Sequence, residues 1–335
     1  MSVLSVRGLR TEYPTHAGVV TAVRDVSFDI AKGEVLGLVG ELGSGKSVTG
    51  FSIMGLLQNP GRIAQGEILF QGEDLTKRSE REMRHLRGNK IAMIFQDPMM
   101  TLNPVLRIDT QIIETIQAHT PMPHKAAWEM ARAALGEVGI PQPESRLSAY
   151  PHQFSGGMRQ RVAIAIALLH KPELLIADEP TTALDVTIQA QILAIVQRLV
   201  AQTGTALIWI THDLSIVSQL ADRIAVMYAG RFVELGSAAH IISQPRHPYT
   251  GGLIGSIPSA NKRGQPLAQI PGTTPSLLNL PPGCPFSARC QFADALCATE
   301  PGLDHAPATP AHGFRCWHPL PTKAIAPTAA AKGTP

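Results

Sequence analysis

Residues 40–47 read GELGSGKS, a glycine-rich stretch that ends in a lysine and a serine. The spacing matches G-x-x-x-x-G-K-[ST], and the stretch follows the apolar run EVLGLV and precedes a segment with a helical pattern, as this motif requires. Its glycines allow backbone conformations in which successive amides converge on a phosphate. Lys46 would supply charge to the outer phosphates of ATP, and the Ser47 hydroxyl would bind Mg²⁺. The expected ATP-binding residues are Gly40, Glu41, Leu42, Gly43, Ser44, Gly45, Lys46 and Ser47.

Two carboxylates follow one another at the end of the apolar run LLIADE, residues 174–179. Asp178 is expected to face the metal ion, through water. Glu179 can then orient and deprotonate an attacking water. The alternative is that Glu179 only caps the end of a strand. A use for a second carboxylate beside a metal-binding one favours the catalytic interpretation.

Three further residues are candidates for the same site. His212 ends the apolar run ALIWIT, where ligand sites gather in α/β sheets, and it is expected to contact the γ-phosphate. Gln96 follows the apolar run IAMIF and would complete the Mg²⁺ shell with Ser47 and Asp178. Tyr13 is a candidate for stacking on adenine, although an ordinary packed tyrosine explains it nearly as well.

A second possible phosphate site lies at residues 154–161, FSGGMRQR, which precede the apolar helical run VAIAIALL. Ser155, Gly156 and Gly157 would stand at a helix N-terminus, where free N–H groups and the helix dipole favour an anion. Capping by Ser155, with glycines present only for close packing, is an equally good explanation. The residues alone do not decide between the two.

All four cysteines lie near the C-terminal end, with the spacing C-x5-C-x6-C-x18-C: Cys284, Cys290, Cys297 and Cys316. In a cytosolic chain glutathione would keep them reduced, which argues against disulfides. Four thiolates suit structural zinc or an iron–sulfur cluster, and free thiols are a third possibility. The C-x2-C pairs typical of zinc ribbons are missing. A metal here would staple a small domain that cannot build its own core, and redox sensing is a weaker hypothesis.

The elements that must position these residues follow from periodicity. Short apolar strands are expected within residues 1–40, helices at 48–58 and 187–202, and a mainly helical region from 79 to 149 interrupted by one strand. Runs such as LLIAD and ALIWIT are typical of buried parallel strands, so the fold class is α/β. The expected domains are residues 1–255, with a helical part at about 97–155, a cysteine-containing C-terminal domain at 256–320, and a disordered tail at 321–335.

Composition excludes several classes of function. The chain has 335 residues and a formal net charge of only +3, without a basic run, so no nucleic-acid partner is expected. The N-terminus lacks the apolar core of a signal peptide, and no run reaches the ~18–20 apolar residues that span a bilayer. We therefore expect the chain to stay in the cytosol and to take any membrane role from a partner.

The order of these motifs, with IFQDP, TTALD and THD between and after them, closely resembles the nucleotide-binding subunits of ABC transporters over residues 3–255. The resemblance implies a P-loop NTPase cassette with a mixed sheet and a helical subdomain. It makes Gln96 the residue that also senses the membrane subunits, Glu179 the catalytic base and His212 the switch histidine. It further implies that Ser155, Gly156, Gly157, Met158 and Asp185 bind the ATP of a facing subunit, and that Tyr13 stacks on adenine.

Phe154 and Met158, which replace a leucine and a glutamine of the general pattern, and the segments HPYTGGLIGSIP and LPPGCPFSARC resemble a narrower group. These are the ATPases of oligopeptide, dipeptide and nickel importers. The resemblance implies a [4Fe–4S] cluster on the four cysteines, with zinc as the alternative. It also implies a second, distinct ATPase subunit, two permease subunits, indirectly a periplasmic solute-binding protein, and a peripheral location on the cytoplasmic face of the inner membrane.

The function expected from the sequence is ATP hydrolysis that powers import of di- or oligopeptides. Nickel or another small solute is the alternative cargo, because substrate choice lies in other subunits. A soluble ABC ATPase acting on ribosomes or DNA fits less well, since such proteins usually carry tandem cassettes or a long coiled-coil insertion. A third possibility is a regulatory subunit with weak catalysis.

Overall fold

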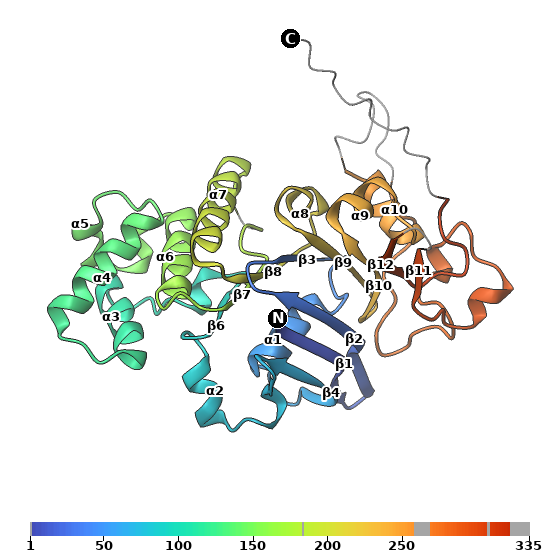
Figure 1. Cartoon of the computed structure of the whole chain (residues 1–335), viewed down its shortest axis with the longest axis horizontal. Helices are drawn as coiled ribbons and strands as arrows, with labels where there is room; N and C mark the ends of the chain where they lie inside the picture. Colours follow the sequence, from blue (N-terminus) through green and yellow to red (C-terminus); the bar gives the residue numbers. More distant parts are fainter. Residues whose placement is uncertain (1, 183, 258–268, 307–308, 322–335) are drawn as a thin grey trace, which may run out of the picture.

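The structure, a computed structural model, describes residues 2–182, 184–257, 269–306 and 309–321. The tail expected to be disordered lies outside the described residues, apart from its first residue. Two β-sheets and a lobe of helices form the chain (Figure 1). Within the described ranges, no helix is long and apolar enough to cross a membrane.

The larger sheet carries the phosphate loop. In spatial order its strands are β11 (Asp304–Ala306), β12 (Thr309–Phe314), β10 (Arg231–Ser237), β9 (Arg223–Tyr228), β3 (Val35–Val39), β8 (Ala206–Thr211), β7 (Leu174–Asp178) and β6 (Ile91–Ile94). The strands from β9 to β6 run parallel, whereas the other pairs are antiparallel. Every residue of β7 and β8 is buried, which explains their uninterrupted apolar sequences.

The smaller sheet is antiparallel and contains β2 (Gly18–Ala31), β1 (Ser2–Thr15), β4 (Arg62–Phe70) and β5 (Glu73–Asp74). Helix α1 (Lys46–Met54) and this sheet pack against one face of the larger sheet, where Ile53, Val23 and Ile208 share an apolar core. The two first strands are longer than their sequences suggest. Register shifts in β1 break the alternation, and pairing continues to a tight hairpin at Thr15 and Gly18.

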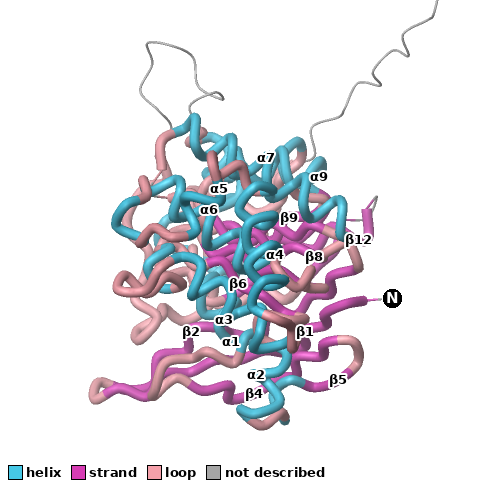
Figure 2. Tube along the Cα trace, turned by 90° about the vertical axis from the view of Figure 1, so that its left-hand side faces the viewer, coloured by secondary structure: helices cyan, strands magenta, loops and turns pink. Residues whose placement is uncertain are grey.

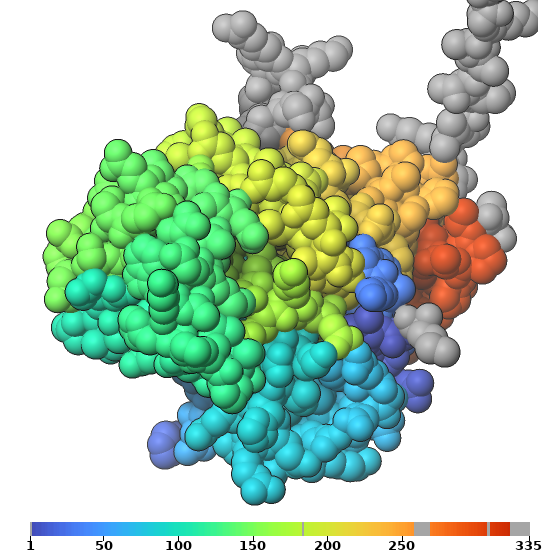
Figure 3. All heavy atoms as spheres, turned by 60° about the vertical axis from the view of Figure 1, so that its left-hand side comes forward, coloured from blue at the N-terminus to red at the C-terminus, as the bar shows by residue number. Residues whose placement is uncertain are grey.

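Helices cover the other face of the larger sheet and form a lobe beside it (Figure 2). After α2 (Glu80–Leu86) and β6, the lobe is built by α3 (Ile108–His119), α4 (His124–Glu137), α5 (Pro143–Leu147) and α6 (Gly156–Leu168). The chain continues through α7 (Val186–Thr203), α8 (Leu214–Leu220), α9 (Ala238–Ser243) and α10 (Pro248–Gly255). The helical region predicted after residue 97 is thus present, and it forms the green lobe of Figure 3.

The cysteine-containing segment joins the cassette through the larger sheet. β12 pairs with β10 at Glu234 and Phe314, and Cys284 and Cys297 belong to the same apolar core as the helices. Glu234 is fully buried, and its Oε1 lies 2.7 Å from Nε2 of His312 in the extension. The four cysteines therefore lie on a segment that continues the sheet and shares its core. The domain boundary at residue 255 stays a prediction.

Candidate nucleotide-binding site

The phosphate loop connects β3 to α1 and is held close to the backbone of other segments. A Cβ at Gly40 would come within 2.2 Å of the Met227 carbonyl oxygen, and one at Gly45 within 2.4 Å of the Ala22 carbonyl oxygen. Gly45 also has a φ of 103°, a conformation that a side chain would oppose. Glycine is required at both positions, as the motif predicts.

Lys46 points back into this loop. Its Nζ donates hydrogen bonds to the carbonyl oxygens of Gly40, at 2.8 Å, and Glu41, at 3.0 Å. The residue is buried, and burial lowers the pKa of its ammonium, opposed by the charges of Glu179 and Asp178. A bound phosphate would give this ammonium a stronger partner than two carbonyl oxygens.

Ser47 and Asp178 meet although 131 residues separate them. The Ser47 hydroxyl donates to Asp178 Oδ1 at 2.9 Å, and Asp178 is buried at the end of β7. Burial raises the pKa of the Asp178 carboxyl. Hydroxyl and carboxylate oxygens are the ligands that Mg²⁺ prefers, so these residues fit the ion, which would offset the cost of the buried charge.

Glu179 is the centre of a cluster of polar side chains. Its Oε2 accepts hydrogen bonds from Thr182 Oγ1, at 2.9 Å, and Gln96 Nε2, at 3.4 Å, and lies 3.4 Å from His212 Nδ1. The backbone of Glu179 has a φ of 44°, an uncommon conformation for a non-glycine residue, and its N–H donates to the Ile210 carbonyl. The structure thus brings Gln96, Asp178, Glu179 and His212 together beside the phosphate loop. Thr182, which sequence reasoning did not single out, belongs to this cluster.

Replacing Asp178 with asparagine should stabilise the nucleotide-free chain at pH 7. Because burial raises the pKa of this carboxyl, its favourable contribution is complete below the unfolded pKa and is lost as the pH rises through the folded pKa. At neutral pH the ionised form therefore destabilises the fold, and removing the charge should raise Tm by about 2 °C or more. The variant should lose the further rise that MgATP gives the unaltered chain. Calorimetry with and without MgATP checks both, and a lower Tm without nucleotide would contradict the first.

The second possible phosphate site has the geometry of a capped helix start. Ser155 caps α6, and its Oγ accepts a hydrogen bond from the Met158 N–H at 3.3 Å. A Cβ at Gly157 would clash with Ile188 Cγ2 at 2.7 Å, whereas one at Gly156 would meet only Leu184 at an ordinary 3.6 Å. Close packing thus explains Gly157 but not Gly156.

This helix start opens into a surface pocket of about 530 Å³. Ser155, Gly156, Gly157 and Met158 line the pocket together with Asp185, which caps α7 by accepting from the Ile188 N–H at 3.0 Å. In Figure 1 α6 lies with the helical lobe, away from α1. One chain therefore presents two separate places that suit phosphate.

Tyr13 lies half-buried in β1, and its ring would contact a Cβ at Gly61 at 2.5 Å. Burial raises the pKa of its hydroxyl. This position explains the residue as packed against the start of β4, and adenine stacking stays a prediction.

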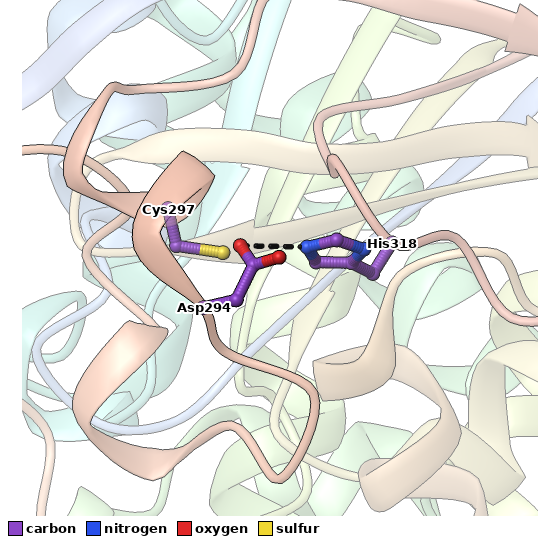
Figure 4. Close-up of side chains that lie close together, drawn as sticks. All are labelled: Asp294, Cys297 and His318. Carbon is purple, nitrogen blue, oxygen red and sulfur yellow. Dashed lines mark ion pairs between the residues drawn. The ribbon is translucent and has the colours of Figure 1, made fainter.

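Cys284 and Cys297 are buried in the C-terminal segment, whereas Cys290 and Cys316 are partly buried. Cys284 donates its N–H to the Cys297 carbonyl at 2.9 Å, and burial raises the pKa of Cys316 to about 11. Within the described residues, one group of three possible metal ligands has all its donor atoms within 4.8 Å of one another: Asp294, Cys297 and His318 (Figure 4). Asp294 and His318 form an ion pair at 2.9 Å. No three cysteine sulfurs of the described chain come that close together.

Three features define a nucleotide-binding cassette of the ABC type. They are the phosphate loop after β3, the two carboxylates at the end of β7, a parallel strand of the same sheet, and the separate helix on the helical lobe that begins with two glycines. Residues 23–182 match the ABC transporter family, and residues 233–297 match the oligopeptide/dipeptide transporter C-terminal region. The chain belongs to the family of ABC transporter ATP-binding proteins that carry this C-terminal region.

Curated relatives support that assignment over nearly the whole length. The chain is 51% identical to the dipeptide transport ATP-binding protein DppD of Bacillus subtilis, over 94% of each chain. It is 47% identical to the oligopeptide transport ATP-binding protein OppD of Escherichia coli, over 95% of this chain and 94% of the relative. Among solved structures, a dimeric bacterial ABC transporter cassette, MJ0796, has the same fold, with a TM-score of 0.64, 24% identity and coverage of 70% of this chain and 98% of that one.

Proposed function

We propose that this chain hydrolyses ATP to power a membrane importer for di- or oligopeptides. The observation that carries the proposal is that Ser47 contacts Asp178, with Glu179 next to it, beside Lys46. The chain is also about half identical to proteins named for dipeptide and oligopeptide transport. Peptide cargo rests on those names, and nickel or another small solute is the alternative.

Each residue of the cluster has a role in this reaction. Lys46 and the loop amides would bind the phosphates. Ser47 and Asp178, with Gln96, would hold Mg²⁺, which would supply positive charge beside the phosphates. Glu179 accepts a proton from the water that attacks the γ-phosphorus, while ADP leaves. His212 donates to the γ-phosphate, and Thr182 and Gln96 hold the Glu179 carboxylate in place.

A facing cassette completes the site in this proposal. The pocket at Ser155 and Gly156 would receive the ATP held by the partner's phosphate loop, with Met158 and Asp185 beside it. Two exposed apolar side chains support a partner here, because Leu42 in the phosphate loop is 89% exposed and Val186 beside Asp185 is 81% exposed. The partner is a second, distinct ATPase subunit.

Two permease subunits would contact the segment that follows Gln96. Movement of the cassette on ATP binding and hydrolysis would reach the permeases through this segment. Met100 and Val105 of this segment are exposed apolar side chains on the approach to α3. They fit contact with a permease better than contact with water. The chain would thus lie on the cytoplasmic face of the inner membrane, and a periplasmic solute-binding protein would act through the permeases.

Co-purification tests the transport role. The tagged chain should bring down two integral-membrane subunits, and ATP turnover of that complex should rise when a peptide-loaded binding protein is added. Nickel-dependent stimulation would replace the peptide assignment. Recovery of ribosomes or DNA without membrane subunits would reject transport altogether.

We also propose that Cys284, Cys290, Cys297 and Cys316 hold a [4Fe–4S] cluster. Burial raises the pKa of the Cys316 thiol, and the charges of the other three cysteines raise it further, so the four side chains lie in one neighbourhood. Four thiolates suit such a cluster, and structural zinc is the alternative. Such a group would tie the extension together. Chain purified without oxygen should absorb near 400 nm and contain iron and sulfide, whereas one zinc per chain, or no metal, would overturn the proposal.

A further inference from the structure

Glu41, the second residue of the phosphate loop, is held by the C-terminal extension. Its two carboxylate oxygens accept from the Arg289 guanidinium, at 2.6 and 2.9 Å, and Oε2 also accepts from Thr274 Oγ1 at 2.8 Å. Arg289 precedes Cys290 by one residue, and 248 residues separate it from Glu41. A contact so distant in sequence joins two parts of the chain that no local pattern connects.

Arg289 is itself fixed in place. Its side chain is only 5% exposed, its Nε donates to the Pro271 carbonyl at 2.8 Å, and its guanidinium lies over the rings of Tyr228 and Phe286. A planar guanidinium that binds a carboxylate through two nitrogens fixes the orientation of its partner as well as its distance. The Glu41 side chain is therefore anchored to a rigid support.

The backbone of Glu41 is anchored as well. Its N–H donates to the hydroxyl of Tyr249 in α10, at 2.9 Å, and its carbonyl accepts from Lys46 Nζ. Side chain and backbone of one loop residue are thus tied to α10, to the extension and to the phosphate-binding lysine. Any displacement of Glu41 would move the carbonyl that Lys46 contacts.

We propose that Arg289 is a positioning residue for ATP binding, through which the C-terminal extension sets the conformation of the phosphate loop. The proposal rests on the proposed function, because it concerns the ATP bound by Lys46. An anchored loop has less freedom to lose when the nucleotide binds. The guanidinium also neutralises a carboxylate that would otherwise repel the phosphates.

Anchoring of the loop and neutralisation of the Glu41 charge predict different losses of affinity for different variants. Arg289→Met frees the loop and leaves the Glu41 charge unpaired, so the Kd for MgATP should rise roughly tenfold. Glu41→Gln loosens the loop but removes the repelling charge, so its rise should be smaller, about threefold. The double variant should resemble Glu41→Gln alone. Independent effects would instead multiply to about thirtyfold.

Arg315→Met is the matched control. Arg315 also precedes a cysteine by one residue and also pairs with the cassette, but at Asp25 of β2, with an N–O distance of 3.3 Å. Its Kd for MgATP should stay within about twofold of the unaltered chain. Thr274→Val, which keeps side-chain volume and removes one hydrogen bond to Glu41, guards against misfolding and should raise Kd by about two- to threefold.

The experiment measures MgATP binding to the full-length variants by calorimetry, with circular dichroism as a check on folding. A folded Arg289→Met or Thr274→Val chain with unaltered affinity, or multiplicative effects in the double variant, would overturn the proposal. So would a loss in Arg315→Met equal to that in Arg289→Met. Lys46→Ala distinguishes failure of the Arg289 proposal from failure of the proposed function, because unaltered MgATP binding in that variant would reject the nucleotide site itself.

Discussion

Replacing Glu179 with glutamine should lower ATP turnover by roughly 10²–10⁴-fold, the range expected for loss of a general base. Binding should survive, because Glu179 touches Thr182, Gln96 and His212 rather than the phosphate loop. The amide can still accept a hydrogen bond, so the cluster should keep its geometry. Turnover and the Kd for MgATP, measured on the same preparation, check the two parts.

Glu173→Gln provides the control. Glu173 directly precedes β7, at the end of the strand opposite to Glu179. On the surface there, its Oε1 pairs with Lys90 Nζ at 2.9 Å. The same chemical change at that end should leave turnover unaltered. Near-normal turnover in Glu179→Gln, or an equal loss in Glu173→Gln, would remove Glu179 from its proposed role.

Replacing Lys46 with alanine should abolish measurable ATP binding, with a Kd roughly 100-fold higher or more. The buried ammonium bonds to two carbonyl oxygens and the Ser44 hydroxyl of the loop, all of them uncharged, so it can exchange them for phosphate. Lys90→Ala is the control, because Lys90 is an exposed lysine directly before β6 of the larger sheet, and this variant should bind ATP normally. Isothermal calorimetry distinguishes the two variants, and tight binding by Lys46→Ala would contradict the site.

The sequence predicts the fold of the cassette well, and it predicts which residues of the proposed ATP site lie close together, because both depend on local patterns. Apolar strands that end in acidic or histidine residues must meet at one edge of a parallel sheet, so the approach of Ser47 to Asp178 follows from strand order. The same reasoning brings His212 to Glu179. These contacts join residues that are distant in sequence. Even so, the periodicity of the sequence alone indicates that each of these residues lies at the end of a strand or at the start of the helix that follows one.

Other features have no local signal. The pairing of β12 with β10 and the hold of Arg289 on Glu41 depend on how the extension folds back, which residue spacing does not reveal. The length of β1 and β2 is hidden by register shifts. Thr182 could have been found only from its position three residues after Glu179, which suits a side chain that reaches back across a turn.

Gly156 offers the most direct measurement of the central claim, that two facing cassettes share each ATP. The Glu179→Gln chain, which we expect to bind ATP and to hydrolyse it slowly, should pair in MgATP with a facing cassette, either a second copy or the partner ATPase. Sedimentation measures the mass of the pair. Adding Gly156→Asp, whose Cβ would meet only Leu184 at an ordinary contact distance, should prevent pairing and leave ATP binding to the single chain intact. Unaltered pairing in the double variant, or full turnover by a dilute monomer of the natural chain, would contradict the account.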